Sequence, residues 1–245
     1  IVFGVYNQNT WQHLWRIQTV HNRMPDEYAV LFQSLLGRDG GLELAQFDKA
    51  IVSSVVPQLT YNIVQMIERR INGKVLLLTH DLDLGIQIDT DTPNRVGADL
   101  LADSVAAYTR FQDDCIVVDF GTATTFTTVT KPGVMRGTAI AAGLNVTIDA
   151  LVRHTAQLPQ IELVPPPSII GRNTVHAMQA GLVVGYVAMV EGLIHRIKAE
   201  IGTSSIKVIA TGGLSGIVAN LTNVFDVVDP WLTLEGLRLI AARNM

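Results

Sequence analysis

The sequence predicts an α/β protein built from two lobes. Strand-like apolar runs alternate with helix-like segments along the chain, which is the pattern of α/β folds. Both halves carry the order strand, turn, strand, helix. The chain has 245 residues, of which 48% are hydrophobic and 16% charged, so two lobes with a sizeable core can form and global disorder is excluded.

Four strands and two helices are expected in the first part of the chain. The polar run Asn7-Gln8-Asn9 separates the first two strands, Pro25 and Asp26 signal a helix start, and Asn72-Gly73 ends the next helix. The expected strands are 1–6, 14–20, 49–55 and 75–79, and the expected helices are 26–36 and 59–71.

Four further strands and four helices are expected after residue 96. The strands are 116–120, 124–130, 134–141 and 206–211, and the helices are 97–111, 144–154, 174–201 and 232–243. The most apolar stretch, 178–194, is shorter than the ~20 residues of a membrane span. It also contains Gln179 and Glu191. We therefore expect a buried helix and no membrane partner.

The two lobes are predicted to be residues 1–111 and 112–245. Residues 116–154 read strand, Gly-Thr turn, strand, turn, strand, helix. Residues 1–36 read as the same unit without its opening strand and turn. We therefore expect that the first strand and phosphate-binding turn of the first lobe are missing from this sequence.

Charge and cysteine content narrow the class of protein. The formal net charge is −4 and the chain has no long basic run, so no nucleic-acid partner is expected. The single cysteine, Cys115, excludes an intramolecular disulfide and fits a cytoplasmic location. Cys115 opens an apolar run without an activating neighbour, so we interpret it as a packed strand residue rather than a catalytic thiol.

The strongest chemical signal is the run Val117-Val-Asp-Phe-Gly-Thr-Ala-Thr-Thr-Phe126. An apolar strand delivers Asp119 to its carboxyl end, and Gly121 permits a tight turn. The hydroxyls and backbone N–H groups from Thr122 to Thr125 can hold phosphate oxygens without a lysine. Asp119 would repel a phosphate, so it fits a cation site. The alternative is a threonine-rich hairpin with a capping aspartate.

Two helix starts and one strand end carry weaker signals. Asp99 follows Gly97-Ala98 in the first turn of a helix, where it can cap the helix or accept a proton from a ligand hydroxyl. Gly212-Gly213 follows a buried strand and allows backbone to pack against a ring or sugar. Thr174 is expected to be the N-cap of the long helix, and its hydroxyl is a possible ligand contact.

Together these segments resemble type III pantothenate kinases over essentially the whole chain. The motifs that carry the resemblance are Ile51-Val-Ser-Ser-Val-Val-Pro57, residues 94–107, Asp119 to Phe126, Ala156-Gln-Leu-Pro159, residues 171–181, Ala210 to Leu214 and Val227-Val-Asp-Pro230. The ordered set is far more specific than any one motif. The family has the actin-like (ribonuclease H-like), duplicated two-lobed kinase fold of the acetate/sugar kinase, actin and chaperone ATPase superfamily.

The resemblance implies an activity, cofactors and partners. Family members phosphorylate pantothenate with ATP in the first step of coenzyme A synthesis. They need magnesium and a monovalent cation, potassium or ammonium, and are homodimers. The resemblance implies that Asp99 is the proton acceptor and that pantothenate is bound by Gly97, Ala98, Asp99 and Leu100. It implies a further substrate contact from Thr174 of the neighbouring subunit and a potassium ligand in Asp119. ATP binding is implied for Thr122, together with Gly121, Thr125, Gly212 and Gly213.

The sequence departs from the family at three places. The phosphate turn Asp-x-Gly-Asn-Thr is not found before Ile1, Leu100 replaces an arginine, and Thr138 and Ala142 alter a glycine- and proline-containing loop. These changes leave two alternatives open. One is a non-catalytic nucleotide-binding or regulatory protein on the same fold, and the other is a kinase or phosphatase of the same superfamily with another small-molecule substrate.

Overall fold

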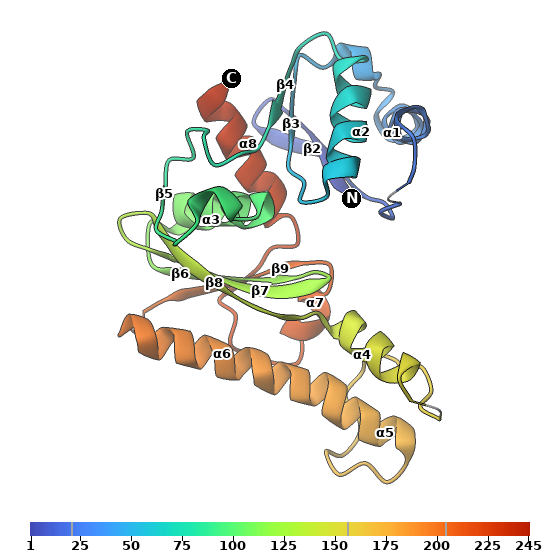
Figure 1. Cartoon of the computed structure of the whole chain (residues 1–245), viewed down its shortest axis with the longest axis vertical. Coiled ribbons are helices and arrows are strands. Elements are labelled where there is room, and N and C mark those ends of the chain that lie inside the picture. The colour runs from blue at the N-terminus through green and yellow to red at the C-terminus, as the bar shows by residue number, and fades with distance from the viewer. Residues whose placement is uncertain (21, 156, 204) are drawn as a thin grey trace. The chain divides into compact units, whose positions relative to one another are not determined.

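The computed structural model describes residues 1–20, 22–155, 157–203 and 205–245. Ala156, which opens one of the family motifs, lies outside the described residues. The chain forms two compact units (Figure 1). Unit 1 consists of Ile1–Gln87, Asp91–Ala106 and Thr233–Met245, and unit 2 consists of Ile88–Thr90 and Ala107–Leu232. Both units are discontinuous in sequence, and the expected lobes, residues 1–111 and 112–245, stay a prediction.

Unit 2 is built on a mixed sheet. Its strands are β6 (Cys115–Phe120), β7 (Ala123–Thr130), β8 (Val134–Ala142), β9 (Lys207–Gly212) and β10 (Val227–Val228), with the short β5 (Gln87–Ile88) at one edge. The order is β10-β9-β6-β7-β8-β5. The central strand β6 pairs antiparallel with β7 and parallel with β9. The hairpin thus lies on one side of β6 and a parallel crossover on the other.

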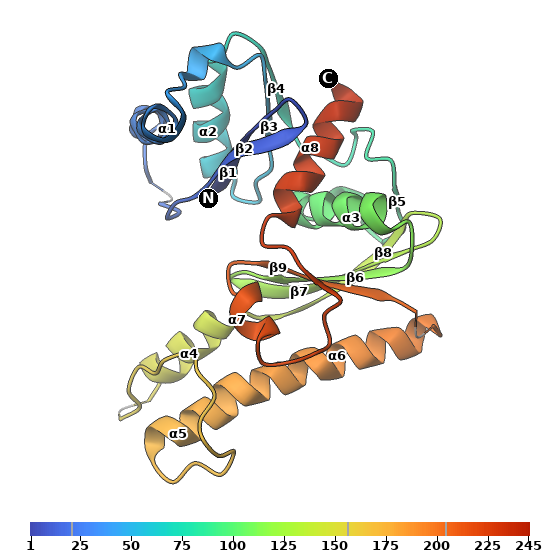
Figure 2. The same ribbon diagram turned by 180° about the vertical axis from the view of Figure 1, so that it is seen from behind.

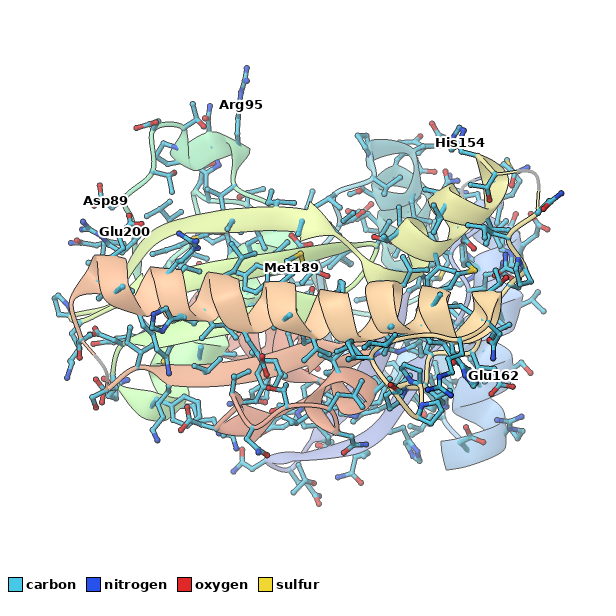
Figure 3. All side chains as sticks on the ribbon, turned by 90° about the horizontal axis from the view of Figure 1, so that it is seen from below. Asp89, Arg95, His154, Glu162, Met189 and Glu200 are labelled. Carbon is cyan, nitrogen blue, oxygen red and sulfur yellow. The ribbon has the colours of Figure 1, made fainter. Side chains whose placement is uncertain are left out.

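One face of this sheet is covered by a long helical segment (Figures 1 and 3). It comprises α5 (Thr174–Gln179), a π-helical turn (Ala180–Val184) and α6 (Gly185–Ile201). Figure 3 looks onto this face, with Met189 labelled on α6 and His154 at the end of α4 (Leu144–Arg153). Alternate residues of β6, namely Ile116, Val118 and Phe120, share one core cluster with buried residues of α4 and α6.

The segment Thr174–Ile201 is the one candidate membrane span within the described residues. Its best window has a mean hydropathy of 1.6, and 44% of that window is buried. Val183, Val187, Val190 and Ile194 of this segment are buried residues of unit 2. Core helices of soluble proteins pass the same length and composition test, so this helix is weak support for a membrane span.

Unit 1 contains two separate strand pairs and the helices that pack on them. β1 (Val2–Asn7) pairs antiparallel with β2 (Thr10–Arg16), and β3 (Lys49–Val52) pairs parallel with β4 (Lys74–Leu77). The β1–β2 turn has positive φ at Gln8 and Asn9, as tight hairpin turns require. Helices α1 (Pro25–Gly40) and α2 (Pro57–Glu68) contribute to one core cluster with the strands.

The two units share an order of elements. In unit 1 the hairpin β1–β2 is followed by α1 and then by β3-α2-β4, a parallel pair with a helix between its strands. In unit 2 the hairpin β7–β8 is followed by α4 and later by β9, α7 (Ser215–Ala219) and β10, again a parallel pair (Figure 2). Unit 2 has β6 in addition. The mixed α/β architecture predicted from the alternating pattern is confirmed.

The parts of α3 (Ala98–Phe111) and α8 (Leu232–Asn244) that belong to unit 1 meet at a glycine. A Cβ on Gly236 would lie 1.9 Å from the carbonyl oxygen of Ala102. Beside this contact, the Thr233 hydroxyl donates to Oδ1 of the buried Asp103 at 2.7 Å. The close backbone approach therefore depends on the missing side chain.

Replacement Gly236→Ala is expected to destabilise the protein by about 1–3 kcal/mol, because a core contact must move to admit the methyl group. Gly37→Ala is the matched control: it lies in α1 with no atom within 4 Å of the added Cβ. The control should be neutral or more stable, since alanine is the better helix former. Urea unfolding measures both, and equal stability of the two variants would contradict the packing assignment.

Cys115 is a packed strand residue, as expected. It is fully buried, and its Sγ donates to the carbonyl oxygen of Asp113 at 3.3 Å. Burial, followed by the charge of Asp113, raises the pKa of the Cys115 thiol to about 12. At pH 8 the folded protein should react with a thiol reagent on the order of 10³-fold more slowly than the unfolded chain. Stoichiometric labelling of folded protein within minutes would refute this.

Candidate active site

A tight turn between β6 and β7 presents the backbone that the sequence singled out. We call residues 121–123 the Gly121 turn. The N–H of Gly121 donates to the carbonyl oxygen of Ala123 at 3.0 Å, and the N–H of Gly143 donates to the carbonyl oxygen of Thr122 at 3.0 Å. Gly121 and Thr122 are exposed. The turn is therefore fixed by its own hydrogen bonds while its outer side remains accessible.

Gly143 backs the Gly121 turn at very short range. A Cβ on Gly143 would lie 2.4 Å from the carbonyl oxygen of Gly121 and 2.5 Å from that of Thr122. Only glycine permits this approach without moving the turn. Gly143 also precedes α4, so the start of that helix and the Gly121 turn are held together.

Asp119 is flanked by two threonines on neighbouring strands. It pairs in register with Thr125 on β7 and with Thr211 on β9, so the three side chains share one face of the sheet. Within the described part of the chain, the hydroxyl oxygens of Thr125 and Thr211 are shielded from solvent and make no hydrogen bond. We call these three residues the Asp119 cluster. One carboxylate with two neutral oxygens is a donor set suited to a hard cation.

Gly212 closes the cluster at the end of β9. Its φ is +89°, and a Cβ there would lie 2.2 Å from Oδ1 of Asp119 and 2.7 Å from the backbone nitrogen of Phe120. The next residues turn sharply, since the hydroxyl of Ser215 donates to the carbonyl oxygen of Gly212 at 2.8 Å. Gly213 is exposed at this turn. Backbone from β9 thus lies directly against the Asp119 carboxylate.

Asp99 lies in unit 1, in the first turn of α3. Its Oδ1 accepts from the N–H of Leu100 at 3.0 Å. A Cβ on Gly97 would come within 2.5 Å of the same oxygen, so the glycine makes room for the carboxylate. The helix-capping interpretation is thereby supported, because the carboxylate occupies the N-terminal end of the helix, where backbone N–H groups favour it.

Thr174 is not the N-cap of the long helix, and that prediction is wrong. The N-cap is Asn173, whose Oδ1 accepts from the N–H of His176 at 2.9 Å. Asparagine and threonine are both good caps, and the sequence alone did not distinguish two adjacent candidates. Thr174 is the first helical residue and is exposed, so its hydroxyl is not occupied by capping.

The structure collects most predicted nucleotide-site residues in one place. Asp119, Gly121, Thr122, Thr125, Gly212 and Gly213 all lie at the ends of β6, β7 and β9 in unit 2. Gly97, Ala98, Asp99 and Leu100 belong to unit 1. Among the described residues, no group of three or more His, Cys, Asp or Glu side chains forms a metal site.

Comparison with known proteins decides the family. The family model described as type III pantothenate kinase matches residues 1–196. This chain belongs to the type III pantothenate kinases. The predicted actin-like fold is confirmed with the family.

Individual relatives agree over nearly the full length. A type III pantothenate kinase from Roseiflexus sp. is 43% identical over 244 residues, covering 100% of this chain and 95% of the relative. One from Brevibacillus brevis is 44% identical with the same coverage. The crystal structure of a conserved Baf family transcriptional activator from Campylobacter jejuni aligns with a TM-score of 0.56 at 18% identity, over 80% of this chain and 82% of that one. The last likeness concerns the fold alone.

Proposed function

We propose that this chain is an ATP-dependent kinase that phosphorylates pantothenate to 4'-phosphopantothenate, the first step of coenzyme A biosynthesis. The supporting observation is the exposed Gly121 turn, set beside the Asp119 cluster in a member of the type III pantothenate kinase family. A backbone turn with free hydroxyls is a phosphate-binding device that needs no lysine. Thr122 and the backbone of the Gly121 turn would then contact the phosphates of ATP, and Gly212 and Gly213 the nucleoside.

The proposed mechanism assigns one chemical task to Asp99. Its carboxylate accepts the proton of the primary hydroxyl of pantothenate as the oxygen attacks the γ-phosphorus of ATP, while the bond from that phosphorus to the β,γ-bridging oxygen breaks and ADP leaves. Gly97, Ala98 and Leu100 hold the substrate around it, and Thr174 of a neighbouring subunit adds a contact in a homodimer. Phosphoryl transfer of this kind depends mainly on positioning and on stabilising the charge that spreads over the phosphate oxygens.

The Asp119 cluster is the proposed site of a monovalent cation. The cluster offers one carboxylate and two buried hydroxyl oxygens that have no partner in the described part of the chain. Such a set fits potassium or ammonium better than a set of several carboxylates would. A bound cation would supply positive charge near the phosphates. Asp119, Thr125 and Thr211 would hold it, and magnesium is proposed to enter with ATP.

We also propose that the chain divides into two duplicated lobes. In unit 2, β6 lies between the hairpin strand β7 and the parallel strand β9. Unit 1 has the corresponding hairpin and parallel pair as two separate sheets. This repeated arrangement of a hairpin and a parallel pair supports two actin-like lobes, proposed at residues 1–111 and 112–245.

The decisive assay is ATP consumption with pantothenate, with and without potassium, on the full-length protein. The proposed function expects product only when pantothenate is present, and stimulation by potassium or ammonium. ATP binding without turnover would favour a non-catalytic regulatory protein. Leu100, which stands where the family has an arginine, supports this alternative. Turnover with another alcohol but not pantothenate would favour a different kinase. A cytoplasmic homodimer without nucleic-acid or membrane partners completes the proposal.

A further inference from the structure

Tyr186, which no sequence motif singled out, links the long helix to the candidate site. Its side chain is 7% exposed, and its hydroxyl hydrogen-bonds the hydroxyl of Thr124 on β7. The backbone N–H of Leu144, at the start of α4, also hydrogen-bonds the Tyr186 hydroxyl. Since a backbone N–H can only donate, the phenol oxygen accepts from Leu144 and its proton is available for Thr124.

These two bonds hold the segments on both sides of the Gly121 turn. Thr124 follows the turn on β7. Leu144 follows Gly143, whose N–H donates to the carbonyl oxygen of Thr122. One phenol oxygen therefore connects the strand leaving the turn with the glycine that backs it. The nearby ring of Phe120, 6.3 Å away between centroids, packs Tyr186 against the residue before the turn.

The local shape of the helix brings Tyr186 to this position. The π-helical turn Ala180–Val184 widens the helix one turn before Tyr186. Such a turn inserts an extra residue into the helical repeat and rotates the residues that follow. Tyr186 and Val187 are both buried after it, together with Val190 and Ile194 on the same face. π-turns often occur at functional sites, which agrees with a role beyond core packing.

We propose that Tyr186 is a positioning residue that fixes the Gly121 turn in its ATP-binding geometry. The inference rests on the proposed function. A purely structural role would be served by phenylalanine, because burying a hydroxyl costs free energy that only its hydrogen bonds offset. The hydroxyl of Tyr186 lies where it meets both segments that enclose the turn. Burial also raises the pKa of Tyr186. The phenol, neutral at pH 7 like any ordinary tyrosine, therefore stays a hydrogen-bond donor to still higher pH.

The test compares Tyr186→Phe with a matched control, Tyr28→Phe. Tyr28 is fully buried in unit 1, and its hydroxyl donates to the carbonyl oxygen of Val20 at 2.8 Å, so the control also loses one buried hydroxyl. Tyr186→Phe is expected to weaken ATP binding about 3- to 10-fold, the loss of one or two hydrogen bonds. The KM for pantothenate should stay within about two-fold, and Tyr28→Phe should change neither value.

Thr124, the hydrogen-bond partner of Tyr186, allows a second test of the proposal. Thr124→Val should reproduce the loss of ATP affinity, Thr124→Ser should restore it, and the double variant Tyr186→Phe/Thr124→Val should be no worse than the single ones. Full additivity of the two substitutions would overturn the proposal. Unchanged ATP affinity in Tyr186→Phe would also overturn it.

Amide hydrogen exchange on the ATP-free protein separates this inference from the proposed function. Tyr186→Phe should speed exchange at Gly143 and Leu144 about 10-fold relative to Tyr28→Phe, because the bond to Leu144 is lost. Equal exchange in the two variants would refute the positioning role. A different outcome is faster exchange in Tyr186→Phe together with a wild-type protein that binds no ATP. That outcome would refute the proposed kinase function, while the link between Tyr186 and the Gly121 turn would stand.

Discussion

Asp99→Asn is expected to lower kcat by about 10²- to 10⁴-fold, the usual contribution of a general base, while leaving the fold intact. The carboxamide has nearly the same shape as the carboxylate, and its oxygen can still accept from the N–H of Leu100. It cannot accept a proton from the substrate hydroxyl. The measurement is steady-state turnover with pantothenate, accompanied by circular dichroism and thermal unfolding.

Asp81→Asn is the control for this substitution. Asp81 is an exposed aspartate of unit 1 whose Oδ1 lies 3.2 Å from Nε2 of His80, and we assign it no role in the site. It should retain wild-type turnover, since isolated surface ion pairs contribute little. A folded Asp99→Asn protein with turnover near that of the control would remove Asp99 from the mechanism.

Gly212→Ala is expected to damage the nucleotide site severely, lowering kcat/KM for ATP by roughly 100-fold. The added methyl group would fall 2.2 Å from Oδ1 of Asp119, and the positive φ of 89° is strained for alanine in any case. Asp119 must shift, and the cation it is proposed to hold shifts with it. Potassium stimulation should therefore disappear together with ATP affinity, measured by titrating each at saturating pantothenate.

Gly216→Ala serves as the comparison for Gly212. It lies in α7, four residues further on, and no atom lies within 4 Å of its added Cβ. Its kinetic constants should stay within about two-fold of wild type, because an alanine in open helical space is tolerated. Equal activity of the two alanine variants would show that the backbone of β9 does not form part of the site.

Much of the fold could be predicted from hydrophobic periodicity. The apolar run after Asp114 became β6, and the helix predicted at 144–154 became α4, within one residue at its end. The predicted strand 14–20 was displaced, because the tight turn at Gln8 and Asn9 starts β2 already at Thr10. β5 and β10 contain two residues each, which is too short for any periodic signal.

The candidate site was predictable only where chemistry is local in sequence. Asp119, Gly121 and Thr122 stand within four residues, so the strand–Asp–Gly–Thr order identified them. Thr211 joins Asp119 only because β9 pairs in parallel with β6, a long-range pairing without local signal. The position of Tyr186 follows a π-turn, which no sequence pattern predicted.

The central position of β6 also affects the order in which the sheet can form during synthesis. Its partner β7 follows at once, but Lys207, which pairs with Cys115, is synthesised much later. Until then the nascent chain exposes an unpaired edge beside Ile116 and Val118, and such edges invite contacts with other chains. Closing so long a loop is slow compared with forming a hairpin. One edge of β6 is therefore expected to stay unpaired on the nascent chain until β9 has been synthesised.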